Sequence, residues 1–113
     1  MERRRMVPTM VQASSYGAVT HYLKAVKELG VARAKASGRE VIDMMKRMPT
    51  DDDCFGKGLV RADGRKIHPA YLFEVKKPQE SKQVGDIYKL VSTLPAEDAF
   101  RPVAEGGCSL VRT

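Results

Sequence analysis

Trp is absent from this 113-residue sequence, and aromatic residues make up only 6% of it. Residues 1–50 carry ten Lys and Arg against four Asp and Glu, whereas residues 51–113 carry ten of each, so the whole net charge of +6 arises in the first half. Proteins that bind single-stranded nucleic acid interleave basic and aromatic side chains, and this half offers no such stacking platform around Arg33 or Arg39. The charge therefore does not favour nucleic acid as a partner, although a small basic interaction protein stays an alternative.

Long apolar runs are also missing. Nothing approaches the roughly 18 consecutive apolar residues of a membrane helix. The charged start MERRRM is not followed by the apolar run of about 7 residues that a secretory signal needs, so we expect no signal peptide in this chain. The length is that of a single domain, residues 1–113.

Cysteine is scarce, with Cys54 and Cys108 far apart and no CxxC pair, which excludes a zinc knuckle and a thioredoxin-type motif. In an oxidising compartment a bridge between them would close a loop of about 55 residues and stabilise the fold by up to about 4 kcal/mol. In a reducing cytosol both would be unlinked thiols.

Signals for catalysis or metal binding are weak. The acidic run Asp51–Asp53 lacks the alternating ligands, the Gly and the closing Glu of a calcium loop. His68 could form a nucleophile dyad with Cys54 or Cys108, but no catalytic signature surrounds either thiol. We therefore predict no catalytic residue, no metal site and no cofactor.

Two helices are expected in the first half. The first spans about 9–29, with Thr9 as N-cap and Gly30 as the C-terminal stop. Its apolar stripe recurs at steps of three and four and needs a partner surface; it comprises Tyr16, Val19, Tyr22, Leu23, Val26 and Leu29. After a small-residue linker at 31–36, a second helix at about 37–48 begins with a capping box of Ser37 and Glu40.

Extended structure is expected in the second half. The Asp63-Gly64 turn signal predicts a hairpin of about 58–76, in which residues 58–62 pair with the alternating strand AYLFEV. A further extended segment, DIYKLVSTL, opens the C-terminal segment and tail at 86–113. Two helices followed by a hairpin and another strand define an α+β domain.

Three stretches add a resemblance to a known family: PTMVQASSYGAVTHYLKAV, DGRKIHPAYLFEVKKP and AFRPVAEGGC. Together they resemble the C-terminal portion of periplasmic solute-binding proteins of branched-chain amino acid type ABC transporters, the type I periplasmic binding proteins. Members of that family are much longer, with two α/β lobes and a ligand in the cleft between them. The chain departs from the family at Gln83-Val84-Gly85, where relatives tend to read Gly-Pro-Trp.

The resemblance implies a non-enzymatic receptor that captures a small solute, such as a branched-chain amino acid, an amide or a carboxylate, and presents it to a membrane permease. It implies a periplasmic location and a Cys54–Cys108 disulfide, and it offers only Ser15 and Tyr16 as weak ligand-binding candidates, since most pocket residues of the family lie upstream. We expect this chain alone to lack a complete ligand cleft. Apolar helix faces left without a lobe should make it self-associate.

Overall fold

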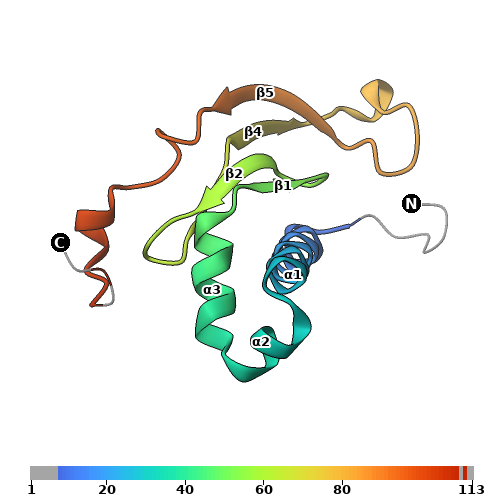
Figure 1. Ribbon diagram of the computed structural model, residues 1–113. Coiled ribbons are helices and arrows are strands. Elements are labelled where there is room, and N and C mark those ends of the chain that lie inside the picture. Colours follow the sequence, from blue (N-terminus) through green and yellow to red (C-terminus); the bar gives the residue numbers. More distant parts are fainter. Residues whose placement is uncertain (1–7, 110, 112–113) are drawn as a thin grey trace.

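The computed structural model describes residues 8–109 and residue 111, and it confirms the α+β class (Figure 1). The basic residues Arg3–Arg5 lie outside the described residues. In chain order the elements are α1 (Met10–Leu29), α2 (Val31–Ala36), α3 (Gly38–Arg47), β1 (Thr50–Asp52), β2 (Gly56–Val60), β3 (Lys66–Ile67), β4 (Ala70–Val75), η1 (Pro78–Glu80), β5 (Tyr88–Leu94) and η2 (Val103–Gly106). None of the described helices has the length and apolar content of a membrane span.

The segment at 31–36 is a short helix and not the expected linker. Gly30, at φ 83°, turns the chain, and the Ala-rich sequence VARAKA then resumes a helix because Ala, Arg and Lys favour it. The capping box expected for α3 is only half formed. The Ser37 hydroxyl accepts a hydrogen bond from the backbone N–H of Glu40, but the Glu40 carboxylate pairs with Arg33 instead of reaching back to Ser37.

Three strands form a small antiparallel sheet in the order β1-β2-β3. Thr50 lies opposite Gly58 in the β1–β2 register, and Leu59 lies opposite Ile67 in the β2–β3 register. The Asp63-Gly64 turn joins β2 to β3, with Gly64 at φ 84°, a conformation that favours glycine. Gly58 is also required, because a Cβ there would lie 2.2 Å from the carbonyl oxygen of Ile67.

The pairing expected within the 58–76 hairpin is wrong. Leu59 and Val60 pair with β3, and Gly58 pairs with β1. Strand β4 pairs with β5 as a separate two-stranded ribbon, for example Tyr71 opposite Thr93. The reason is local: β3 ends after Ile67, and Pro69 has no N–H to extend the ladder, so the chain leaves the first sheet before β4 begins. In the described part the ribbon packs against no other helix or strand.

The core is small and lies where α1 and α3 meet the sheet, with Ala25 and Val41 fully buried. The buried face of α1 consists of Gly17, His21 and Ala25. Most of the predicted stripe is exposed, with Leu23 at 58%, and only its last members, Val26 and Leu29, are half-buried. The radius of gyration is 17.4 Å. A compact domain of this length would have about 13 Å, so the described part is elongated.

Candidate functional site

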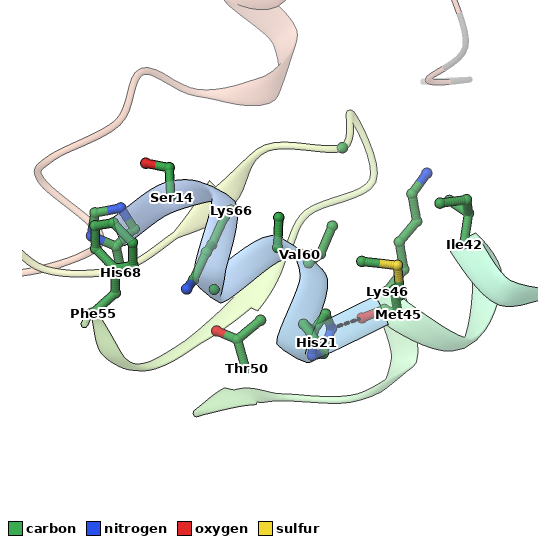
Figure 2. A pocket seen from close by; sticks show the side chains of 13 residues that line it. Ser14, His21, Ile42, Met45, Lys46, Thr50, Phe55, Val60, Lys66 and His68 are labelled. Atoms are coloured by element: carbon green, nitrogen blue, oxygen red, sulfur yellow. Dashed lines mark hydrogen bonds between the residues drawn. The ribbon is translucent and has the colours of Figure 1, made fainter. Parts of the chain in front are cut away.

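A pocket of about 390 Å³ lies where α1, α3 and the three-stranded sheet meet (Figure 2). We call it the central pocket. Its walls are mostly apolar with a few polar side chains, the composition typical of small-molecule sites. The lining residues are Ser14, Gly17, Ala18, His21, Ile42, Met45, Lys46, Thr50, Phe55, Val60, Gly64, Lys66 and His68.

His21 enters the pocket from α1 and is only 5% exposed. Its Nε2 lies 2.8 Å from the backbone oxygen of Met45 on α3, the dashed contact in Figure 2. A carbonyl only accepts, so Nε2 carries the proton of this hydrogen bond. Nδ1 has no partner among the described residues, and in the neutral ring it is an acceptor inside the pocket wall.

Thr50 is the second buried polar residue of the pocket, at 1% exposure. Its hydroxyl lacks a hydrogen-bond partner in the part of the chain that the structure describes. Its neighbour across the sheet is Gly58, whose missing side chain leaves room for the hydroxyl, since a Cβ there would lie 2.9 Å from Oγ1. Buried polar atoms without partners are uncommon because each costs about 1–3 kcal/mol. The wall of the central pocket therefore contains two buried polar atoms, which a ligand or water reaches only after neighbouring side chains move.

An ion pair closes one side of the pocket. The Lys66 ammonium lies 2.5 Å from Oδ2 of Asp52, and Oδ1 accepts hydrogen bonds from the backbone N–H groups of Cys54 and Phe55. Burial acts to raise the pKa of Asp52, but the hydrogen bonds from Lys66 and the two N–H groups more than offset it and lower the pKa. Lys66 is thus neutralised by Asp52 and is poorly placed to bind the carboxylate of a solute.

Gly17 lets α1 approach this ion pair closely. A Cβ at position 17 would lie 3.1 Å from Oδ2 of Asp52 and 3.3 Å from the Lys66 nitrogen. The Lys66 ammonium also lies 4.5 Å from the centre of the Phe55 ring, a cation–π distance. The Asp52–Lys66 ion pair thus connects α1, the three-stranded sheet and the turn between β1 and β2.

Both histidines make their hydrogen bonds to backbone oxygens, His68 through Nδ1 to Pro69 at 2.8 Å and His21 to Met45. Neither ring is engaged with a cysteine in these contacts. Among residues 8–109 and 111, no group of three or more His, Cys, Asp or Glu side chains converges as a metal site would require.

The weak candidates Ser15 and Tyr16 lie on the exposed side of α1, outside the pocket lining. Their neighbours Ser14 and Gly17 line the pocket instead. Sequence reasoning did not assign His21 and Thr50 to a site. One signal could have found His21: together with Gly17 and Ala25 it repeats every four residues, which marks one helix face.

Cys54 and Cys108 are both free thiols in the structure, Cys54 exposed and Cys108 half-buried. Cys54 lies in the turn between β1 and β2, and Cys108 follows η2. Their disulfide stays a prediction.

Comparison with known proteins identifies the family to which this fold belongs. Residues 1–82 match the family model described as periplasmic binding protein. The chain belongs to this family. No curated protein matches it.

Two crystal structures share the architecture. One is a periplasmic binding protein from Burkholderia mallei, 42% identical, with a TM-score of 0.82; the match covers 98% of this chain and 28% of that protein. The other is a branched chain amino acid ABC transporter periplasmic ligand-binding protein from Burkholderia xenovorans, 33% identical, with a TM-score of 0.81; the match covers 96% of this chain and 28% of that protein. This chain thus spans little more than a quarter of each solved relative.

Proposed function

We propose that this chain serves as the C-terminal part of a substrate-binding protein of an ABC transporter, which captures a small solute in the periplasm and delivers it to a membrane permease. The observation that carries the proposal is the likeness to the two Burkholderia proteins along nearly the whole chain. The solute class is a branched-chain amino acid, an amide or a carboxylate. Capture and release need no bond to break, so we propose no enzymatic activity and no cofactor.

The central pocket supports part of this role. Its apolar walls suit an aliphatic or aromatic group, while His21 Nδ1 and Thr50 Oγ1 are buried in the wall and meet a ligand only after neighbouring side chains move. A free amino acid also carries a carboxylate and an ammonium, which require charged or strongly polar partners. Because Asp52 and Lys66 neutralise each other, we expect those partners to come from the part of the binding protein that corresponds to the other 72% of the relatives.

The test is a chimera in which this chain replaces the corresponding segment of the Burkholderia xenovorans protein. Leu, Ile, Val, Asn and benzoate are added singly, and thermal unfolding is followed by circular dichroism. A solute that binds only the folded state stabilises it by about 2.7 kcal/mol at a hundred times its dissociation constant. We expect at least one solute to raise the melting temperature of the chimera.

The unaltered Burkholderia xenovorans protein is the matched control, measured with the same solutes. A chimera that melts at the temperature of this control, yet responds to no solute that stabilises the control, would contradict the proposal. For the 113-residue chain alone, amide NMR spectra with the same solutes should show at most weak shifts. Tight binding to the chain alone would show that the proposed division of the site is wrong.

A further inference from the structure

A second pocket, of about 370 Å³, lies at the turn between β2 and β3, away from the central pocket except at Gly64, which lines both. We call it the arginine pocket. Three of its lining residues are arginines and one is an acid. The full lining is Arg61, Asp63, Gly64, Arg65, Arg101, Gly106 and Cys108.

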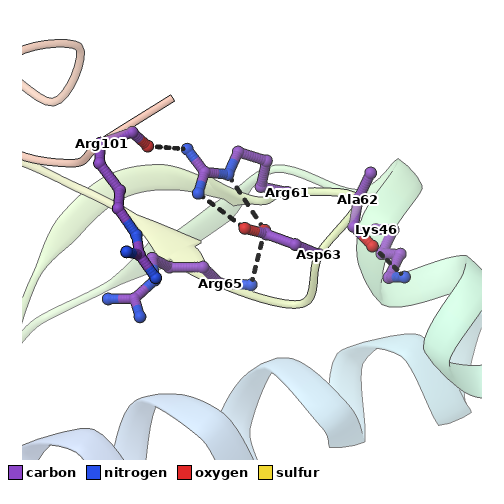
Figure 3. Close-up of polar contacts among 6 residues, drawn as sticks. All are labelled: Lys46, Arg61, Ala62, Asp63, Arg65 and Arg101. Atoms are coloured by element: carbon purple, nitrogen blue, oxygen red, sulfur yellow. Dashed lines mark hydrogen bonds and ion pairs between the residues drawn. The ribbon is translucent and has the colours of Figure 1, made fainter. Parts of the chain in front are cut away.

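The turn that forms this pocket is held on three sides (Figure 3). Within the turn, the Arg61 N–H donates to the Arg65 oxygen at 2.9 Å, and the Gly64 N–H donates to the Arg61 oxygen at 2.8 Å. From α3, the Lys46 ammonium donates to the Ala62 oxygen at 2.7 Å. From the C-terminal segment, the Arg101 oxygen accepts from Arg61 Nη1 at 2.9 Å. The backbone around the pocket is therefore positioned before any ligand arrives.

Charge is unbalanced in this pocket. The Arg61 guanidinium forms a two-point ion pair with Asp63, Nε to Oδ1 at 3.0 Å and Nη2 to Oδ2 at 2.7 Å, so these two charges cancel. The Arg65 and Arg101 guanidinium groups line the same pocket, and neither has an acidic partner in the described part of the chain. Arg65 instead lies 5.9 Å from the centre of the Phe100 ring. Two positive charges remain in one pocket.

We propose that the arginine pocket binds a small oxyanion with two negative charges, such as hydrogen phosphate or a short dicarboxylate. A guanidinium group presents parallel N–H donors whose spacing matches the oxygens of a carboxylate or phosphate. The Arg65 and Arg101 side chains supply these donors from two segments. Because both residues are exposed, water and salt screen the attraction, and the affinity belongs in the millimolar range.

The test titrates the 113-residue chain with sodium phosphate and, separately, with sodium succinate, while sodium chloride keeps the ionic strength constant. Amide NMR signals of Gly64, Gly106 and Gly107 report on the pocket and on the residue that follows it. We expect saturable shifts with at least one of the two dianions and none with acetate at the same ionic strength. Saturation with phosphate alone, succinate alone or both supports the proposal and distinguishes the source of the anion.

Variants separate a specific pocket from general positive charge. The double variant Arg65→Gln/Arg101→Gln should weaken binding at least tenfold, and it leaves the Arg61–Asp63 pair and the Arg101 backbone oxygen in place. The control is Arg39→Gln, which removes an exposed charge at the start of α3. No saturation with either dianion, or an equal loss in the control, would overturn the inference. None of these results depends on the proposed transport function.

Discussion

Breaking the Asp52–Lys66 ion pair tests how much this pair stabilises the packing of α1 on the sheet. The two perturbations are Asp52→Asn, which removes the charge but keeps an oxygen for the N–H groups of Cys54 and Phe55, and Lys66→Met, which keeps the aliphatic stem. The Asp52 side chain is 4% exposed and that of Lys66 is 24% exposed, so water compensates little for a lost partner. We therefore expect each single variant to lower the free energy of unfolding.

The size of the expected decrease in the free energy of unfolding follows from this burial. Removing one partner of a fully buried pair costs about 3–5 kcal/mol, and surface pairs contribute about 0–1 kcal/mol. The partly exposed Lys66 places this pair between the two, at about 2 kcal/mol for each single variant. The double variant removes both charges and leaves neither buried alone, so its cost should be about 2 kcal/mol and not the sum of about 4 kcal/mol. The coupling energy is the difference, about 2 kcal/mol.

The assay is urea unfolding of the wild type and the three variants, followed by circular dichroism and Tyr fluorescence so that the two probes check for a single transition. Glu74 and Lys89 provide the control pair, because they are 4.0 Å apart with side chains 64% and 57% exposed. The cycle with Glu74→Gln and Lys89→Met should give a coupling of at most about 0.5 kcal/mol. Equal couplings in the two cycles would refute the reasoning.

Three further predictions follow from the structure. Gly58→Ala should destabilise the fold by about 2–3 kcal/mol in urea unfolding, because its Cβ meets the Ile67 oxygen, whereas Gly38→Ala, with open space around it, should not; equal stabilities would contradict this. The Arg61 hydrogen bond lowers the pKa of Asp63 to about 2, so its contribution to stability is present above its unfolded pKa of 3.8 and is lost as pH falls toward 2. Asp63→Asn should remove that part of the pH dependence of the free energy of unfolding, measured by urea unfolding between these pH values. An unchanged pH dependence would contradict this prediction. Light scattering at rising concentration should show self-association through the outward face of α1 around Leu23, and a strictly monomeric folded chain would count against it.

Local signals predicted α1 and α3 but missed α2, because they register the ends of long helices, which depend on a few neighbouring residues. Gly30 and Ser37 mark ends that α1 and α3 have in the structure, and the Asp63-Gly64 turn joins two strands as expected. The partner of β4 could not be predicted in the same way. Residues 58–62 and 88–94 are both apolar enough to pair with it, and the choice depends on where Pro69 ends the ladder.

The pocket residues were harder to predict than the elements. Periodicity marked the large apolar side chains of α1 as a face that needs a partner surface, but the face that packs on α3 and the sheet carries Gly17, His21 and Ala25. Small residues there allow the close approach that Asp52 and Lys66 need, and hydrophobicity scales do not register that requirement. The burial of Thr50 depends on Gly58 across the sheet, a contact that no local pattern contains.

The apolar stripe of α1 and the β4–β5 ribbon both expose large apolar side chains to water. Tyr71 and Phe73, on one face of β4, are 45% and 51% exposed, and Leu72 between them, on the opposite face, is 55% exposed, so the ribbon is poorly covered on both faces. A two-stranded ribbon is marginally stable in water, whereas the unit of α1, α3 and the first sheet has its own core at Ala25 and Val41. Protection of the β4–β5 amides from hydrogen exchange should therefore depend on association and rise with protein concentration, while protection at the α1–α3 core stays constant. Equal protection of both regions at every concentration would mean that the ribbon is stable without a covering surface.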